Sequence, residues 1–350
     1  MKRYGFLYEK IYDIENIKKA HHKARLGKRH YRDVIIVNSN EEYYCNKIHN
    51  ILKNENYQVN INSYKHMKII DKGKERDIFK LPYYPHRIIQ WAIMLQIEPI
   101  FKKMFIFDTY ASIEGRGLHD AMKRIKHKMK DKEDTKYCLK LDIKKYYPNI
   151  NNNILYKLLT EKFKDEKLLK LLHEITFSMG EKGQPIGSLW SQYAGNFYLT
   201  KFDHWLKEVK GVKHYFRYCD DMVIMHSDKN FLRELLKDIK IYLKDNLDLN
   251  LKENYQIFPS HKRGIDFLGY RFFDGYILLR KRTVKKMKKQ LVQYANKNLL
   301  SYSDYCSINS YLGWLKYCNS FRLKYKYFRQ LNYKKYIDFD GNIQTLKLNF

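Results

Sequence analysis

Two adjacent acids, Asp220 and Asp221, interrupt a stretch that otherwise favours a β-strand, HYFRYCDDMVIMHS, which runs from His214 to Ser227. Aromatic and β-branched residues favour strands, whereas Asp disfavours them. A hairpin turn is one explanation, because Asp tolerates turn geometry and bonds its own backbone. Hairpin turns usually contain Asn-Gly or Asp-Gly, however, and no glycine stands nearby. Adjacent carboxylates also repel each other, so a chemical explanation must be weighed beside the turn.

A third acid, Asp142, stands in the stretch YCLKLDI, which alternates with the two-residue period of a strand. The alternation places Asp142 on one face with Cys138 and Lys140, and it predicts that the opposite face is buried: Leu139, Leu141 and Ile143. An acid on a strand, together with a hairpin that carries two acids, is what two-metal phosphoryl transfer requires. Two Mg²⁺ ions about 4 Å apart must be held by carboxylates on rigid elements. No His/Cys pattern with metal-ligand spacing accompanies these acids, so Mg²⁺ is favoured over zinc, and Mn²⁺ is expected to substitute for it.

The elements that must position these acids are predicted to be helices that alternate with few strands. Apolar residues recur at helical spacing in four segments, residues 87–105, 151–163, 188–209 and 228–247. Strand-like runs lie between and after them, at residues 137–147, 214–218, 222–227 and 267–273. Residues 1–70 are expected to be mostly helical, and so are the strongly basic residues from 280 onward. Because the central strands form a hairpin, an α+β fold is favoured over a doubly wound parallel sheet.

The charge of the chain indicates a polyanionic partner. The 350 residues include 68 Lys and Arg against 38 Asp and Glu, which gives a formal net charge of +30. The chain also contains 32 Tyr and 19 Phe. Basic surface interleaved with aromatic rings suits a nucleic-acid backbone and its bases.

The cysteines and the apolar segments exclude several other classes of protein. The five cysteines are scattered and never spaced as CxxC, so neither a disulfide framework nor a cysteine zinc site is expected. The most apolar stretch, RIIQWAIMLQIEPIF, is too short and too polar to cross a bilayer. Charged residues interrupt the N-terminal segment before any signal-peptide core can form. We therefore expect a soluble, cytoplasmic protein that has no membrane partner.

Several motifs together resemble those of reverse transcriptases. FRYCDDMVI resembles the YxDD hairpin of this family, and LKLDIKKYYPNI resembles its first catalytic strand. KGQPIGSLWSQYAGNFYL resembles the third palm motif, KERDIFKLPYYPHRIIQ the fingers motif, and FDTYASIEGRGLHDAM the segment that follows the fingers motif. FLGYRFF resembles the primer-grip region and SYLGWLKYCNS a thumb helix. The resemblance covers nearly the whole chain and implies no maturase, endonuclease, integrase or RNase H domain.

The resemblance implies the right-hand polymerase architecture, an α+β fold with fingers, a palm of antiparallel sheet plus helices, and a helical thumb. The expected division is an N-terminal basic helical region that joins the fingers (1–70), fingers (71–136), palm with the catalytic hairpin (137–280) and basic thumb (281–350). The expected partners are template RNA, the primer or cDNA strand, and dNTPs.

The resemblance also implies roles for individual residues around the acids. Asp142, Asp220 and Asp221 would be catalytic and, with the backbone of Ile143, would hold two Mg²⁺ ions. Tyr147 matches the ring that excludes a ribose 2′-OH, with a core tyrosine as the alternative.

The remaining implied roles concern the nucleotide and the template. The incoming nucleotide would be bound by residues of the fingers and the third palm motif: Lys74, Arg76, Ile186 and Gly187. Template and primer would be contacted by Arg87, Arg116 and Gln192. For Lys74 and Arg76 the alternative is a solvated surface cation. Lys252 lies near the family's proposed proton donor to pyrophosphate, but a solvated lysine is the preferred interpretation.

One departure from the family's pattern indicates a subgroup. Pro185-Ile186-Gly187 stands where intron-type and retroviral enzymes usually carry Pro-Gln-Gly. The pattern Ile-Gly-x-x-x-Ser-Gln, the stretch KARLGKRHYRD and the GRG at 115–117 resemble diversity-generating retroelement enzymes. That resemblance implies error-prone copying of a template-repeat RNA with a small basic accessory protein. The alternatives are a defence-associated reverse transcriptase of the abortive-infection type and a catalytically silent RNA-binding module.

Overall fold

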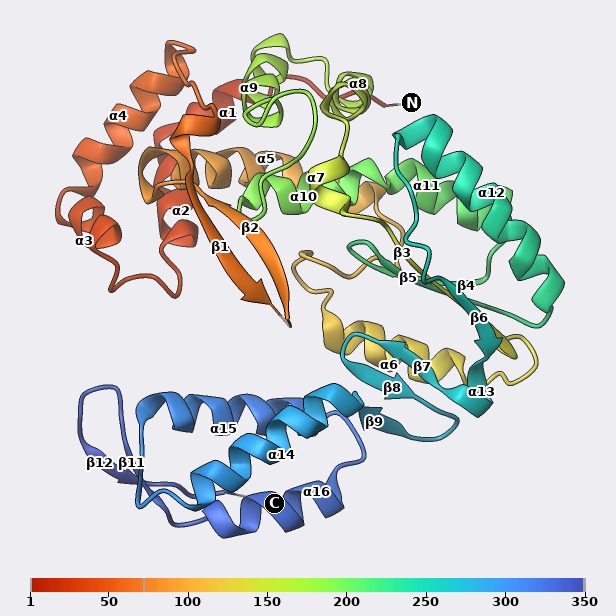
Figure 1. Cartoon of the computed structure of the whole chain (residues 1–350). Coiled ribbons are helices and arrows are strands. Elements are labelled where there is room, and N and C mark those ends of the chain that lie inside the picture. Colours follow the sequence, from red (N-terminus) through yellow and green to blue (C-terminus); the bar gives the residue numbers. More distant parts are fainter. Residues whose placement is uncertain (1, 72, 349–350) are drawn as a thin grey trace. The chain divides into compact units, whose positions relative to one another are not determined.

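The computed structural model describes residues 2–71 and 73–348 (Figure 1). The chain divides into two compact units that each combine separate stretches of sequence. The first unit consists of Met1–Arg116, Leu141–Val212 and Glu234–Tyr255. The second unit consists of Gly117–Lys140, Lys213–Arg233 and Gln256–Phe350. Helices combine with mainly antiparallel sheets, which confirms the expected α+β class.

The N-terminal part of the first unit is a cluster of helices. They are α1 (Tyr8–Tyr12), α2 (Ile14–Ala24), α3 (Arg32–Ser39), α4 (Glu41–Lys53) and α5 (Ile88–Met104). The side chain of Asp13 accepts hydrogen bonds from the backbone N–H groups of Glu15 and Asn16, so it caps the start of α2. α5 is apolar on most of its surface and is buried against α1, α2 and α10, as expected for a helix in the middle of a core.

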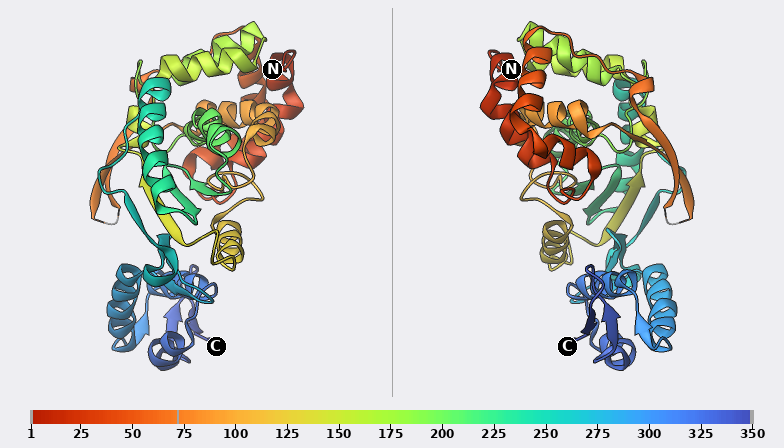
Figure 2. Two further views of the ribbon diagram at one scale, coloured as in Figure 1. Left: turned by 90° about the vertical axis from the view of Figure 1, so that its right-hand side faces the viewer. Right: turned by 90° about the vertical axis from the view of Figure 1, so that its left-hand side faces the viewer.

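A long hairpin, β1 (Lys65–Asp71) and β2 (Lys74–Lys80), extends away from these helices (Figures 1 and 2). Two short helical turns flank it, η1 (Ile61–Ser63) and η2 (Tyr83–Arg87). Residues 1–70 are mostly helical, as expected, and β1 is the exception. Residues 65–70 are all exposed, so the strand has no buried face and shows no apolar alternation in the sequence.

The rest of the first unit is helical. Its helices are α7 (Tyr146–Asn149), α8 (Asn152–Lys162), α9 (Glu166–Thr176), α10 (Leu189–Tyr198), α11 (Thr200–His204), η3 (Trp205–Val209) and most of α12 (Lys229–Leu247). The side-chain oxygen of Gln90 on α5 accepts hydrogen bonds from the backbone N–H groups of Leu189 and Trp190 at 3.0 and 3.3 Å. These bonds satisfy donors at the N-terminus of α10 that a helix leaves unpaired, and so fix α10 to α5.

The central sheet has the strand order β4-β5-β3-β6. Its strands are β3 (Tyr137–Asp142), β4 (His214–Tyr218), β5 (Asp221–His226) and β6 (Gln256–Pro259), and α6 (Leu118–Lys128) contacts β4. The predicted strands at 214–218 and 222–227 are confirmed, and so is the buried face of Leu139, Leu141 and Ile143. Cys138 is also buried, so the opposite face of β3 opens to solvent only toward Lys140 and Asp142.

A second sheet follows in the order β7-β8-β9, with α13 (Ser260–Arg263) before it. Its strands are β7 (Ile265–Phe267), β8 (Tyr270–Phe272) and β9 (Ile277–Leu279). The sequence predicts one strand over residues 267–273, and this is wrong, because the chain reverses at Leu268 and Gly269. Both residues have positive φ, 54° and 87°.

The C-terminal part is α14 (Lys281–Ala295), α15 (Tyr302–Leu315) and α16 (Phe321–Phe328), with the turn η4 (Arg329–Leu331). A small sheet accompanies these helices, with β10 (Leu299–Leu300) parallel to β11 (Lys335–Ile337) and β12 (Ile343–Thr345) antiparallel to β11. α15 packs on β10 and β11. The C-terminal part is mainly helical, as expected, and these short strands are the exception. Within residues 2–71 and 73–348, none of the helices has both the length and the apolar character needed to cross a bilayer.

Candidate active site

The two adjacent acids lie at a two-residue hairpin turn. Tyr218 pairs with Asp221, which leaves Cys219 and Asp220 as the loop between β4 and β5. Cys219 takes the left-handed conformation, φ 57°, that a glycine usually supplies in such turns. Its carbonyl accepts a hydrogen bond from the fully buried Arg217 at 3.1 Å. A non-glycine residue held in this conformation costs of order 1 kcal/mol, and such strain gathers at functional sites. The turn therefore explains the conformation, while the acids still need a chemical explanation.

A cation lies close to Asp221 within the second unit. The Nζ of Lys140 is 3.9 Å from Oδ1 of Asp221, and the two side chains are 26% and 28% exposed. The same Nζ donates a hydrogen bond to the backbone carbonyl of Asp266. The open face of β3 thus places the partly buried ammonium of Lys140 near the carboxylate of Asp221.

Asp142, the last residue of β3, is held by a residue that the sequence interpretation set aside. The Nζ of Lys252 donates to Oδ1 of Asp142, and each side chain is 31% exposed. The backbone continues the contact, because Lys252 N donates to Asp142 O at 2.8 Å and Lys144 N donates to Asn250 O at 2.8 Å. The interpretation of Lys252 as a solvated lysine is therefore wrong. The two residues are 110 positions apart, and no local signal in the sequence connects them.

Tyr147 lies with Tyr146 against a glycine of α10. The hydroxyl of Tyr146 donates to the carbonyl of Gly195 at 2.5 Å. A Cβ on Gly195 would lie 3.1 Å from Cε1 of Tyr147 and 3.3 Å from Cε1 of Tyr146. The glycine therefore permits both rings to approach α10 closely. Tyr147 itself is half-buried, neither a core residue nor a solvated one.

The loop before α10 connects Tyr147 with the β1–β2 hairpin. Gln184 N donates to Tyr147 O at 2.9 Å, and Phe79 N of β2 donates to Ile186 O at 2.9 Å. Gly187 has φ 116°, and a Cβ there would lie 3.1 Å from the carbonyl oxygen of Phe79. Only glycine combines this φ with so close an approach. The structure thus brings three predicted nucleotide-binding residues, Tyr147, Ile186 and Gly187, together with β2.

The other predicted nucleotide-binding residues lie on β2 itself. Arg76 is exposed and pairs with Ile69 across the hairpin. Lys74 begins β2, and its side chain lies outside the described part of the structure. Gln192 is exposed, although most of the residues of α10 are buried. A polar side chain at the one open position of such a helix is available to a bound strand.

The predicted template-binding arginines make contacts inside the first unit. Arg87 is half-buried, and its Nε donates to the carbonyl of Ala24 at 3.4 Å. Desolvation by burial lowers its pKa. Arg116 donates from Nη1 to the carbonyl of Ile106 at 2.9 Å and lies 5.7 Å from the ring centroid of Phe107. Each guanidinium carries five N–H donors, so these bonds leave capacity for a phosphate.

Two buried amides support the site and were not identified from the sequence. Gln184 is 3% exposed, and its Nε2 donates to Asn152 Oδ1 at 2.7 Å and to Thr176 O at 2.9 Å. These bonds anchor the loop that carries Ile186, just as Gln90 anchors α10. A lone amide in an apolar run, as in RIIQWAIM, is the signal that could have identified Gln90.

A sheet in which an acid-bearing strand, β3, neighbours an acidic antiparallel hairpin fits the fold of right-hand polymerases. Residues 51–272, more than half of the chain, match the family described as reverse transcriptase (RNA-dependent DNA polymerase). The chain therefore belongs to the reverse transcriptase family.

Several known proteins are similar to this chain. Protein YkfC of Escherichia coli is 24% identical over 254 residues, which cover 60% of this chain and 65% of YkfC. The group II intron-encoded protein LtrA of Lactococcus lactis is 24% identical over 139 residues, which cover 37% of this chain and 23% of LtrA. A solved structure of telomerase from Candida albicans, in complex with a fragment of telomeric RNA, is also similar. The superposition covers 69% of this chain and 51% of the telomerase chain, with 12% sequence identity and a TM-score of 0.49. The chain thus spans less than two thirds of the length of these relatives.

Proposed function

We propose that this chain is an RNA-directed DNA polymerase that joins dNTPs to a primer on an RNA template by two-metal phosphoryl transfer. The observation that carries the proposal is the position of the acids in the sheet. Asp142 ends β3, Asp221 begins the neighbouring strand β5, and Asp220 occupies the turn before it. Carboxylates on rigid neighbouring strands can hold two ions in common.

The donor set fits Mg²⁺, for which Mn²⁺ can substitute. Three carboxylates and the backbone carbonyl of Ile143 offer hard oxygen ligands. Two of the acids already lie near ammonium groups, Asp142 near Lys252 and Asp221 near Lys140, so an arriving Mg²⁺ must compete with these cations for the carboxylate oxygens. Bound Mg²⁺ would activate the attacking hydroxyl and neutralise charge on the phosphorus oxygens.

The other predicted residues have roles in this proposal. Lys74 and Arg76 on β2 bind the incoming triphosphate, and Ile186 and Gly187 face the nucleotide. Tyr147 excludes a ribose 2′-OH. The template and primer are contacted by Arg87, Arg116 and Gln192. The proposed division remains 1–70 for the basic helical region that joins the fingers, 71–136 for the fingers, 137–280 for the palm and 281–350 for the thumb.

Primer extension tests the proposal directly. The purified chain, a defined RNA template with an annealed primer, dNTPs and Mg²⁺ should give cDNA of template length. The same reaction without divalent ions should give none. If no dNTP is incorporated with either Mg²⁺ or Mn²⁺, the proposed activity is rejected.

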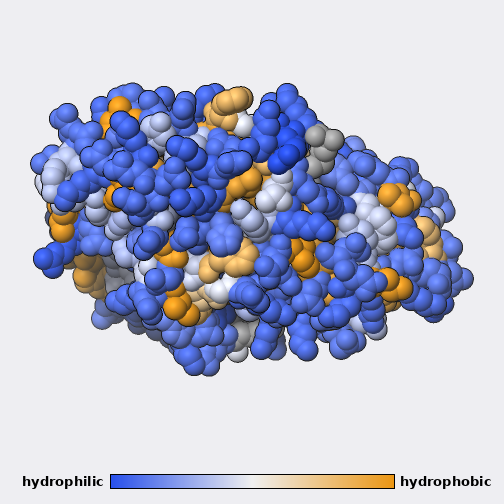
Figure 3. Space-filling view, turned by 90° about the horizontal axis from the view of Figure 1, so that it is seen from above, coloured by the Kyte–Doolittle hydropathy of each residue, from blue (hydrophilic) through white to orange (hydrophobic). Residues whose placement is uncertain are grey.

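RNA binding should be strongly dependent on salt. The net charge is +30, and the face in Figure 3 is mostly hydrophilic, with hydrophobic residues only in small separate groups. Lysines and arginines that neutralise Z phosphates displace counterions, so log affinity falls with log salt at a slope of about −0.7Z for a single strand. Filter binding across a salt series measures the slope. Arg76→Gln should make the slope shallower by about the contribution of one phosphate contact. A flat plot would contradict the assignment of the basic surface to RNA binding.

For the subgroup, we infer a diversity-generating retroelement enzyme that works with a small basic accessory protein. The support is Ile186, which stands where intron-type and retroviral enzymes usually carry glutamine, together with the GRG at 115–117. A defence-associated enzyme is the second candidate, because it shares parts of this pattern. Neighbouring genes separate the two. Paired template and variable repeats beside an accessory gene support the first, and their absence supports the second.

Low copying fidelity is expected to follow from Ile186. Its backbone carbonyl binds Phe79 of β2, so the position connects the β1–β2 hairpin with the proposed nucleotide site. An isoleucine side chain offers no donor or acceptor to a nucleotide, whereas glutamine offers both. Discrimination is the difference between the contacts of a correct pair and those of a mispair. Ile186→Gln should therefore lower the error rate several-fold, which corresponds to about 1 kcal/mol for one hydrogen bond.

Sequencing cDNA copied from a defined RNA measures the errors of the wild type and the variant. Ile186→Val, which keeps an aliphatic, β-branched side chain, is the matched control and should leave the error rate unchanged. Equal error spectra for Ile186→Gln and the wild type would show that Ile186 only fills space beside α10.

A further inference from the structure

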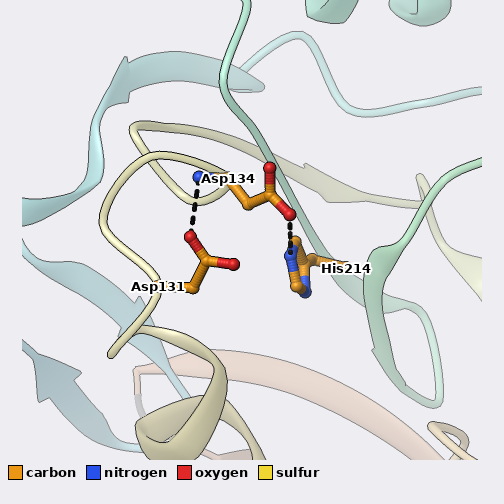
Figure 4. Close-up of side chains that lie close together, drawn as sticks. All are labelled: Asp131, Asp134 and His214. Atoms are coloured by element: carbon orange, nitrogen blue, oxygen red, sulfur yellow. Dashed lines mark hydrogen bonds and ion pairs between the residues drawn. The ribbon is translucent and has the colours of Figure 1, made fainter.

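Outside the acids of the proposed polymerase site, three side chains that can ligate a metal meet in the second unit. They are Asp131 and Asp134, in the loop between α6 and β3, and His214, the first residue of β4. One ligand atom from each lies within 4.8 Å of the others. In Figure 4 the carboxylate of Asp134 faces the ring of His214, and Asp131 lies beside them on the same loop as Asp134.

The spacing of the cluster is too wide for hydrogen bonds but suits a shared ion. The distance between Nε2 of His214 and Oδ2 of Asp134 is 3.7 Å, beyond the range of a hydrogen bond. Ligands around a tetrahedral zinc ion, at bond lengths near 2.1 Å, lie about 3.4 Å apart.

The environment of His214 is independent evidence that this cluster binds a ligand. It is 3% exposed, yet neither Nδ1 nor Nε2 has a hydrogen-bond partner among the described residues. Buried polar atoms are almost always paired, so such an imidazole requires an explanation. Its Nε2 lies 3.7 Å from Oδ2 of Asp134, with Asp131 close by, and an imidazole with two carboxylates is a donor set for zinc and similar divalent ions.

The loop that carries the acids is rigid. Asp134 N donates to Oδ1 of Asp131 at 3.1 Å, which orients that carboxylate. Thr135 is fully buried, and its backbone N–H donates to Asp131 O at 3.2 Å. Ser260 of α13 donates from its backbone to Lys136 O at 3.0 Å and from its hydroxyl to Thr135 O. The loop backbone and the carboxylate of Asp131 are thus oriented by hydrogen bonds before any ion arrives, which favours binding.

One cation already competes for this position. The ammonium of Lys213 forms an ion pair with Oδ2 of Asp134, and the lysine side chain is 64% exposed. An arriving divalent ion must displace this ammonium. Because the lysine side chain is exposed, it can rotate into solvent and leave the carboxylate free.

We propose that Asp131, Asp134 and His214 form a binding site for a divalent transition-metal ion of the zinc class, separate from the proposed Mg²⁺ site. Three protein ligands and water complete a tetrahedral shell. The ion would join the lead-in to β3 with the start of β4 and so stabilise the sheet that carries the hairpin acids. The cysteine pattern predicts no zinc site, and this cluster contains no cysteine. The proposal does not depend on polymerase activity.

Metal titration of the untagged full chain tests the site. The chain is stripped with a chelator, dialysed, and titrated with Co²⁺ in excess Mg²⁺, which occupies the proposed polymerase site. Co²⁺ bound to an imidazole and carboxylates gives a visible absorption band, which zinc should abolish by displacement. One Co²⁺ per chain is expected. Asp131→Asn should weaken binding at least about tenfold, because even outer-shell partners of metals contribute 10–100-fold.

Matched variants separate this site from others. Asp220→Asn should keep the Co²⁺ band, whereas His214→Gln should lose it. Lys213→Gln should strengthen binding a few-fold, because the competing ammonium is gone. Because His214 is buried and its variant could unfold, thermal unfolding of Asp131→Asn is the second readout. At one zinc concentration, the rise in Tm should be larger for the wild type than for Asp131→Asn. Equal Co²⁺ binding by the wild type and Asp131→Asn, or no band in either, would overturn the proposal.

Discussion

Asp220→Asn is expected to abolish metal-dependent incorporation of dNTPs on an RNA template while the fold remains intact. Asparagine has the shape of aspartate but lacks its charge, so it holds Mg²⁺ far less well. Asp220 lies in the turn, outside the paired residues of β4 and β5, and the substitution therefore breaks no strand pairing. Loss of several kcal/mol of charge stabilisation corresponds to a fall in rate of about a thousandfold or more.

Single-turnover primer extension in Mg²⁺ measures this loss. Asp245→Asn is a matched control, because Asp245 is an exposed acid on α12 and its replacement should leave the rate unchanged. Both variants should unfold at the wild-type Tm. If Asp220→Asn extends primers at close to the wild-type rate, Asp220 does not act in catalysis and the two-metal proposal is rejected.

Local patterns in the sequence predicted the elements that carry the acids. Alternation over YCLKLDI predicted β3 and its buried residues Leu139, Leu141 and Ile143, and the aromatic run HYFRY predicted β4. These patterns are informative because one face of the strand is buried and the other is not. The long apolar helix α5 was predicted for the same reason, since its spacing repeats over several turns.

Features without a buried face, or with partners distant in sequence, could not be predicted in this way. β1 is exposed along residues 65–70, so no apolar pattern marks it. Lys252 meets Asp142 across 110 positions, and His214 approaches a loop that lies 80 residues earlier in the chain. Such contacts arise only when the sheet assembles, and each residue alone resembles an ordinary surface lysine or a core histidine.

Gly195 shows a third limit of prediction from the sequence. Inside a helix a glycine is unfavourable by about 1 kcal/mol relative to alanine, so its presence indicates a packing reason without naming the partner. The structure identifies the partners as the rings of Tyr146 and Tyr147. The resemblance to reverse transcriptases had singled out Tyr147, but not the residue that sets how near its ring lies to α10.

Tyr147→Ala is expected to admit ribonucleotides. In the proposed site the ring occupies the space that a ribose 2′-OH would need, and its removal opens that space. A steric barrier of 1–3 kcal/mol corresponds to roughly 10–200-fold discrimination, and most of it should disappear. Steady-state incorporation of a dNTP and the matching rNTP on one template gives the ratio. Tyr147→Phe keeps the ring and is the matched control, so it should discriminate like the wild type.

Gly195→Ala should move the same ring without removing it. The added Cβ would lie 3.1 Å from Cε1 of Tyr147, so the ring must shift by a few tenths of an ångström. Because Tyr146 donates to the carbonyl of Gly195, its ring is the less free of the two to move, and Tyr147 should take up most of the displacement. A ring pushed away from α10 moves toward the proposed sugar position, so we expect slower dNTP incorporation with discrimination kept. If Tyr147→Ala and the wild type select dNTPs equally well, Tyr147 only packs against α10, and the slower incorporation in Gly195→Ala should then also be absent.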